Sequence, residues 1–126
     1  MTLVLDASSV LAFLHDEPGA ERVWSVLSQA VVGTVNWSEV VQKALRRQVD
    51  ITGMREEFVQ AGVVFSPFTV EQAEIAALLW DKTRHLGLSL GDRACLALAM
   101  EQQLPILTAD RAWSELDLGL QIQLVR

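Results

Sequence analysis

The stretch SLGDRACLALAMEQQLPILTAD, residues 89–110, decides the fold. Ser89, followed three residues later by Asp92, is a capping box that opens an apolar helix. The segment 105–108 that follows this helix is a short apolar strand. Asp92 and Asp110, one near the head of the helix and one just past the strand, are each followed by an arginine. An acid beside an apolar core is costly unless it is paired, solvated or bound to a cation. The sequence therefore raises the question of whether these acids lie on separate surfaces or in one pocket.

Outward from this stretch, strands and helices alternate along the whole chain. We predict strands at 2–5, 31–35, 63–65, 105–108 and 121–125. We predict helices at 7–15, 20–27, 54–61, 70–84, 89–102 and 111–116, with a further helix capped by Asn36. Such alternation indicates an α/β fold, a three-layer α/β/α domain with a mainly parallel central sheet of about four or five strands. The length predicts a single domain over residues 1–126.

Composition narrows the class of protein. Half of the 126 residues are hydrophobic, which is typical of a compact globule, and no apolar run reaches the ~18 residues of a membrane span. The N-terminus lacks the basic segment of a signal peptide, and the single cysteine, Cys95, excludes an internal disulfide. We therefore expect a cytoplasmic protein with no membrane contact. The net charge of −6 disfavours nucleic-acid binding, unless an acidic cluster loaded with divalent metal presents a positive surface.

Four carboxylates are expected at one edge of the sheet. Asp6 ends the first strand, and Asp110 lies just past the fourth. Glu39 and Asp92 each lie in the first turn of a predicted helix. Ligand sites of parallel α/β sheets form beyond the carboxyl ends of the strands, so these acids would meet there and repel one another without a cation. Oxygen ligands without His or Cys suit Mg²⁺ or Mn²⁺.

Each acid also has an ordinary structural explanation. Asp92 alone is explained by helix capping, Asp6 and Asp110 by turns after strands, and Glu39 by a solvated helix face. Thr108 lies two residues before Asp110, so both side chains would face the same way on an extended segment. Thr108 is equally explained as a strand former. Only the joint placement of the acids favours a metal site.

The residues resemble those of a known family. LVLDASSVLAFLHDEPGA, NWSEV, LSLGDRACLALA and LPILTADRAW are similar to the motifs of PIN-domain ribonucleases, above all the VapC toxins of bacterial type II toxin–antitoxin pairs. The similarity runs in order from Leu3 to Trp113 and is weakest at 50–68. Matched by motif, the acidic residues of the family fall on Asp6, Glu39, Asp92 and Asp110, with Thr108 as the accompanying hydroxyl.

The resemblance implies Mg²⁺- or Mn²⁺-dependent cleavage of RNA phosphodiester bonds by an endoribonuclease. It implies that Asp6, Glu39, Asp92 and Asp110 hold the metal. It also implies a homodimer and a cognate VapB-like antitoxin as partner. The alternative is a catalytically silent PIN-like module that binds RNA or protein, which the presence of all four acids disfavours.

Contacts with the RNA are left open by the sequence. Arg93 and Arg111 could reach a phosphate or balance the neighbouring acids. Lys43, Arg46 and Arg47 could form a phosphate track or an exposed helix face. Trp37 and Trp113 could stack a base or pack in the core, whereas Trp24 and Trp80 fit a core or an interface. Cys95 is predicted to be a small core residue.

Overall fold

The computed structural model describes residues 2–126. Within this range the chain forms five strands, β1 (Leu3–Leu5), β2 (Ala30–Gly33), β3 (Val64–Ser66), β4 (Ile106–Thr108) and β5 (Ile122–Leu124). The α-helices are α1 (Ala7–Leu14), α2 (Ala20–Val26), α3 (Thr34–Arg46), α4 (Met54–Gln60), α5 (Val70–Leu78), α6 (Trp80–Thr83) and α7 (Leu90–Gln102). Three 3-10 helices complete the chain: η1 (Leu27–Gln29), η2 (Arg84–Leu86) and η3 (Arg111–Glu115).

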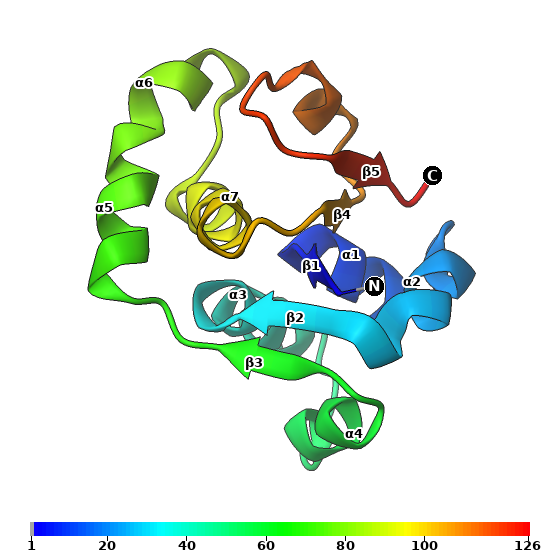
Figure 1. Cartoon of the computed structure of the whole chain (residues 1–126). Helices are drawn as coiled ribbons and strands as arrows, with labels where there is room; N and C mark the ends of the chain where they lie inside the picture. Colours follow the sequence, from blue (N-terminus) through cyan, green and yellow to red (C-terminus); the bar gives the residue numbers. More distant parts are fainter. Residues whose placement is uncertain (1) are drawn as a thin grey trace.

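The strands form one parallel sheet in the order β3-β2-β1-β4-β5, which Figure 1 shows from bottom to top. β1 is the central strand, and Val4 pairs with Val31 of β2 on one side and with Ile106 of β4 on the other. Every pairing among residues 2–126 is parallel. The predicted α/β fold with a parallel sheet is therefore confirmed.

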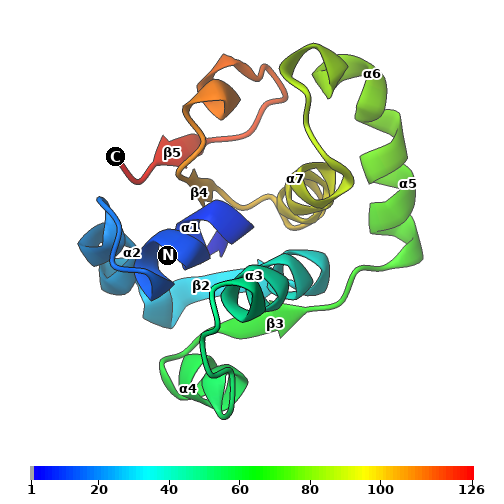
Figure 2. The same cartoon turned by 180° about the vertical axis from the view of Figure 1, so that it is seen from behind.

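Two apolar cores cover the two faces of the sheet. Alternate residues of β1 point to opposite faces, so Leu3 and Leu5 enter one core and Val4 enters the other. The first core contains side chains of α1, α2, α3 and α4, and the second contains those of α7 together with Leu79 and Trp113. Figures 1 and 2, which view the molecule from opposite sides, show α3 behind β2 in one and in front of it in the other. The layers are thus α/β/α, as predicted.

Two predicted helices differ from the observed ones. The helix expected after an Asn36 cap begins three residues earlier, at Thr34, with Gly33 as its N-cap, so β2 also ends at Gly33 rather than at 35. The single helix expected over 70–84 is interrupted at Leu79. There the hydroxyl of Thr83 donates to the carbonyl of Leu79 at 2.8 Å, and such side-chain bonding to the preceding turn bends helices.

Smaller differences concern element ends and tryptophans. The third strand lies one residue later than predicted, and the segment 111–116 forms the 3-10 helix η3 instead of an α-helix. Gly87, in the left-handed conformation, ends the helical segment that closes with η2. Trp24 and Trp80, which fitted a core or an interface in the sequence, are 63% and 51% exposed, so they do not belong to the core.

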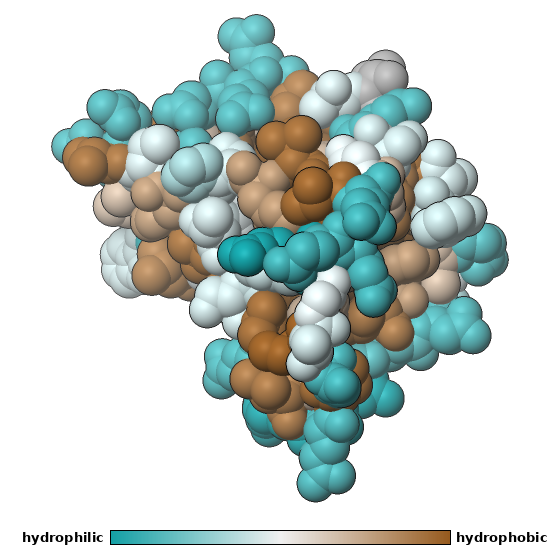
Figure 3. All heavy atoms as spheres, turned by 90° about the horizontal axis from the view of Figure 1, so that it is seen from below, coloured by the Kyte–Doolittle hydropathy of each residue, from teal (hydrophilic) through white to brown (hydrophobic). Residues whose placement is uncertain are grey.

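The surface carries several large apolar side chains. Figure 3 views the molecule from the edge formed by β3 and α4 and shows hydrophobic patches between hydrophilic ones. Val59 of α4 and Val64 of β3 are among the exposed apolar residues, as are Leu78 of α5 and Leu90 of α7. No helix formed by residues 2–126 combines the length and the apolar character needed to cross a bilayer.

Candidate active site

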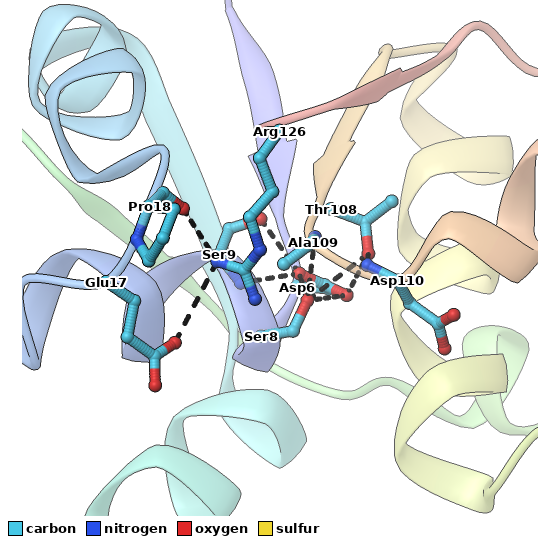
Figure 4. Close-up of polar contacts among 9 residues, drawn as sticks. All are labelled: Asp6, Ser8, Ser9, Glu17, Pro18, Thr108, Ala109, Asp110 and Arg126. Carbon is cyan, nitrogen blue, oxygen red and sulfur yellow. Dashed lines mark hydrogen bonds and ion pairs between the residues drawn. The ribbon is translucent and has the colours of Figure 1, made fainter.

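Asp6 lies directly after the central strand and is only 3% exposed. Its carboxylate is the N-cap of α1, since Oδ1 accepts a hydrogen bond from the backbone N–H of Ser9 at 2.9 Å. The Ser9 hydroxyl lies 2.9 Å from the same oxygen, and the Ser8 hydroxyl lies 2.8 Å from both carboxylate oxygens. From β4, the Thr108 hydroxyl donates to Oδ2 (Figure 4). One buried carboxylate thus connects β1, α1 and β4.

The segment after β4 is attached to the same network by its backbone. The N–H of Ala109 donates to the Ser8 hydroxyl at 2.9 Å, and the N–H of Asp110 donates to the Thr108 hydroxyl at 3.0 Å. The carboxylate of Asp110 instead accepts from the N–H of Ala112 and caps η3. Asp110 is exposed, and Figure 4 shows its carboxylate directed away from Asp6. The backbone of Asp110 is therefore held near Asp6, whereas its carboxylate is held at the start of η3.

Burial sets the protonation behaviour of Asp6. Removal from water raises the pKa of the Asp6 carboxyl above its ordinary value, while the hydroxyl of Thr108, the N–H of Ser9 and the hydroxyl of Ser8 oppose the rise. The donors orient the carboxylate without supplying a positive charge. A buried acid held in this way is stabilised further by a cation.

Glu39 of α3 lies against the first turn of α7. A Cβ added to Gly91 would come within 2.1 Å of Oε1 of Glu39 and 2.7 Å of its Cδ, so only glycine leaves room for the carboxylate. Asn36, which is 2% exposed, donates from Nδ2 both to Oε1 of Glu39 at 3.2 Å and to the carbonyl of Gly91 at 3.0 Å. The amide of Asn36 therefore orients Glu39 and joins α3 to α7.

Asp92 is part of the capping box at the head of α7. Its Oδ2 accepts the N–H of Ser89 at 3.0 Å, and its own N–H donates to the Ser89 hydroxyl at 3.1 Å. The predicted cap is thus confirmed. Its other oxygen, Oδ1, accepts no hydrogen bond from residues 2–126. Capping and ligand binding are therefore compatible in this side chain, because one oxygen stays free.

The pKa values of Glu39 and Cys95 report which acids lie near them. Burial raises the pKa of Glu39, the negative charge of Asp92 raises it further, and that of Asp6 adds a smaller rise. Cys95 in α7 is fully buried, and its thiol has a pKa well above the ordinary value because of burial and then the charges of Asp6, Asp92 and Glu39. Asp110 does not contribute to either shift. Glu39 therefore lies within electrostatic reach of both Asp92 and Asp6.

The described residues do not form a complete metal cage by themselves. Within residues 2–126, no group of three or more His, Cys, Asp or Glu side chains is already arranged to hold a metal ion. The donor chemistry nevertheless fits a hard divalent cation, since Asp6, Glu39 and Asp92 offer only oxygen, and Gly91 leaves space at the carboxylate of Glu39. Mutual repulsion of three partly buried carboxylates would be relieved by a cation between them.

The arginines that follow the acids have structural partners. Nη1 of Arg93 donates to the carbonyl of Ala76 in α5 at 2.9 Å, and its Nε is buried. Nη1 of Arg111 donates to the main-chain oxygen of Arg126 at 3.1 Å. The sequence left open whether Arg93 reaches a phosphate or balances the neighbouring acid. In the structure its hydrogen bond instead connects α7 to α5.

The tryptophans near the site serve packing. Trp113 is completely buried, so the stacking of a base on this ring is excluded in this structure. Trp37 is half-buried, and its ring centroid lies 5.3 Å from that of Phe58 and 4.7 Å from that of Phe65. Cys95 is a core residue, as predicted.

Three residues of the site were missed or misread in the sequence. Asn36 was interpreted as a helix cap, although its spacing of three from Glu39 places both on one helix face. Ser9 follows Ser8 without any distinguishing pattern, and its hydroxyl contacts both Asp6 and the carbonyl of Leu107. Gly91 carried one signal, since glycine in the first turn of an apolar helix indicates close packing.

The fold and the site define a class of protein, a parallel α/β domain with clustered carboxylates at the carboxyl end of its sheet. A model of the PIN domain matches residues 3–118, and the chain therefore belongs to the PIN domain family. No curated protein matches the sequence.

Several solved structures share this fold. A chain of the DNA-bound VapBC complex from Salmonella typhimurium superposes with a TM-score of 0.74 at 14% identity, covering 100% of this chain and 99% of that one. A toxin–antitoxin complex from Klebsiella pneumoniae gives 0.72 at 16% identity, with 91% and 92% covered. VapBC-1 from nontypeable Haemophilus influenzae gives 0.72 at 17% identity, with 99% and 98% covered. At these identities the likeness establishes the fold alone.

Proposed function

We propose that this chain is a single PIN domain that acts as a Mg²⁺- or Mn²⁺-dependent endoribonuclease, the toxin of a VapBC-type toxin–antitoxin pair in the cytoplasm. The observation that carries the proposal is that Glu39 of α3 is under the electrostatic influence of both Asp92 of α7 and Asp6, which follows β1, in a PIN fold. These segments are far apart in the sequence, so chance placement of acids does not account for it.

The chemistry assigned to each residue follows from its surroundings. Asp6 and Asp92 hold the cation, Asp6 because it is buried without a positive partner and Asp92 because its Oδ1 is free. A bound divalent ion acidifies the attacking water and stabilises charge on the phosphoryl oxygens. Glu39, whose pKa is raised by burial and by Asp92, would serve as the proton acceptor beside such a cation. Thr108 orients Asp6, and Asp110 joins the site when its exposed side chain turns inward.

The partners are inferred from the similar structures and from the surface. The structures from Salmonella and Haemophilus are VapBC complexes, which supports a VapB-like antitoxin as partner of this chain. Leu78 at the end of α5 and Trp80 at the start of α6 are 78% and 51% exposed, and burial of such apolar side chains would favour a homodimer. A basic side chain of the antitoxin would neutralise the carboxylates in place of the metal.

Cleavage of a long RNA tests the proposal. Cleavage is expected with Mg²⁺ or Mn²⁺, loss is expected in EDTA, and restored metal should restore it. A variant with Asp6→Asn, Glu39→Gln, Asp92→Asn and Asp110→Asn, purified in the same way, controls for contaminating nuclease. Cleavage that continues undiminished in EDTA, or in this variant, contradicts the proposal. A protein that binds RNA without cleaving it would support the silent binding module.

A further inference from the structure

A basic pocket lies next to the acidic site. It has a volume of about 430 Å³ and is lined by Ser8 of α1, His15 just after α1, Lys43, Arg46 and Arg47 at the end of α3, and Arg126. Ser8 is shared with the acidic site, since its hydroxyl contacts the carboxylate of Asp6. Lys43 lies one helical turn beyond Glu39, and its positive charge lowers the pKa of that carboxyl. The basic pocket and the acidic site are therefore contiguous.

The charge of this pocket is unusual for the chain. The protein has ten Lys and Arg residues against sixteen acids, yet four of the ten line this one pocket. Its acidic lining residue, Glu17, lies 3.9 Å from Nη1 of Arg126, which also donates to the carbonyl of Pro18 at 2.7 Å (Figure 4). Glu17 is thus partly neutralised by Arg126. The pocket keeps the surplus charge of Lys43, Arg46 and Arg47.

These three cations are available for a ligand. All three are exposed, and none of them has an ion pair or a hydrogen bond from its side chain to any part of the chain between residues 2 and 126. Basic residues at a helix C-terminus interact favourably with the helix dipole, but this effect needs no pocket and does not involve Arg126. Guanidinium groups bind phosphate with paired hydrogen bonds. The volume also suits a sugar–phosphate unit.

We propose that this basic pocket binds backbone phosphates of the RNA strand adjacent to the phosphate that is cleaved. The inference rests on the proposed function. The acidic site takes the scissile phosphate together with its metal, and the basic pocket takes a neighbouring phosphate of the same strand. This protein, although acidic overall, thereby binds RNA, because its positive charge is concentrated along the path of the RNA strand.

Binding of a fluorescein-labelled single-stranded RNA, followed by anisotropy in EDTA so that no cleavage occurs, tests this assignment. The variant Arg46→Ala/Arg47→Ala is compared with the control Arg55→Ala/Arg84→Ala, which removes the same charge from exposed residues on α4 and η2. The pocket variant should bind at least about tenfold more weakly than the control, as expected for lost contacts to charged groups. Its plot of log affinity against log salt should flatten by about 1.4, which corresponds to two lost phosphate contacts on a single strand.

The outcomes separate this inference from the proposed nuclease activity. Equal affinity and equal salt dependence of the two variants, or no RNA binding by the wild type, overturns the pocket assignment whatever the cleavage assay shows. A difference in binding without any cleavage by the wild type keeps the pocket and refutes the nuclease. Binding of a polyglutamate peptide through Arg46 and Arg47, with no RNA bound there, would identify an acidic protein segment as the ligand and also overturn it. In the cleavage assay the pocket variant should raise KM more than it lowers kcat.

Discussion

Substitution of Gly91 by alanine should separate activity from stability. The added methyl group would lie 2.1 Å from Oε1 of Glu39, so the carboxylate has to leave its position. Without a positioned Glu39, cleavage should fall about 100-fold or more, the usual contribution of a positioned acid or base. Because the displaced atoms are the end of a flexible side chain, the backbone can remain in place.

The stability change follows from two opposing effects. Alanine is favoured over glycine inside a helix by roughly 0.8–1.0 kcal/mol, and Gly91 lies in the first turn of α7. Displacement of Glu39 loses its 3.2 Å hydrogen bond with Asn36, which costs about 0.5–1.5 kcal/mol. The two nearly cancel, so the melting temperature in EDTA should change by only a few degrees. The stabilisation by Mn²⁺ should decrease, since fewer ligands remain in place.

A double-mutant cycle provides the control. In a Glu39→Ala background no carboxylate opposes the new methyl group, so Gly91→Ala should then stabilise the metal-free protein by about 1 kcal/mol and cause no further loss of cleavage. RNA cleavage and thermal melting with EDTA or Mn²⁺ are measured for all four proteins. A Gly91→Ala protein that cleaves like the wild type, with the same Mn²⁺ shift, would refute the position of Glu39 in the site.

Three further predictions concern the acids and the surface. Asp92→Asn should keep the capping box, because an amide oxygen can still accept the N–H of Ser89, and should lose cleavage by orders of magnitude while its metal-free melting temperature holds or rises; normal cleavage would leave Asp92 with the capping role alone. Burial raises the pKa of Asp6 in the folded state, so its contribution to metal-free stability is fully present below the unfolded pKa and is lost as pH rises through the folded pKa. The free energy of unfolding of Asp6→Asn, measured with urea, should therefore increase relative to that of the wild type as the pH rises. Parallel pH profiles of the two proteins would contradict this prediction. Light scattering should show a dimer that Leu78→Glu weakens, and a wild-type monomer throughout the micromolar range would exclude it.

The parallel sheet was predictable because short strands alternate with helices along the chain, a pattern that places parallel strands side by side. The same rule brought Asp6, Glu39 and Asp92 together, since it places the ends of parallel strands at one edge. The direction of the Asp110 carboxylate was not predictable, because it is set by a local bond to the N–H of Ala112. The direction of such a side chain depends on the rotation of a few bonds, and the periodicity of the sequence carries no information on that rotation.

The misread elements have a common physical origin. Asn36 is a good helix cap by residue type, but in the fold its amide is used to connect Glu39 with Gly91. Thr83 fits the helical pattern, yet its hydroxyl bonds to the carbonyl of Leu79, where the helix breaks. In both cases a polar group forms a specific hydrogen bond that residue preferences do not encode.

The place of β1 at the centre of the sheet has a consequence for protein synthesis. β1 and β2 leave the ribosome early, but β4, which pairs Leu5 with Leu107, emerges about a hundred residues after β1. Until then Asp6 lacks the Thr108 hydroxyl, and the edge of β1 that β4 will cover is unpaired. Contacts between such distant segments form late, and domains complete folding only when their last elements are available. A growing chain therefore lacks both the complete sheet and the full hydrogen-bond network around Asp6 until nearly all of its residues have been made.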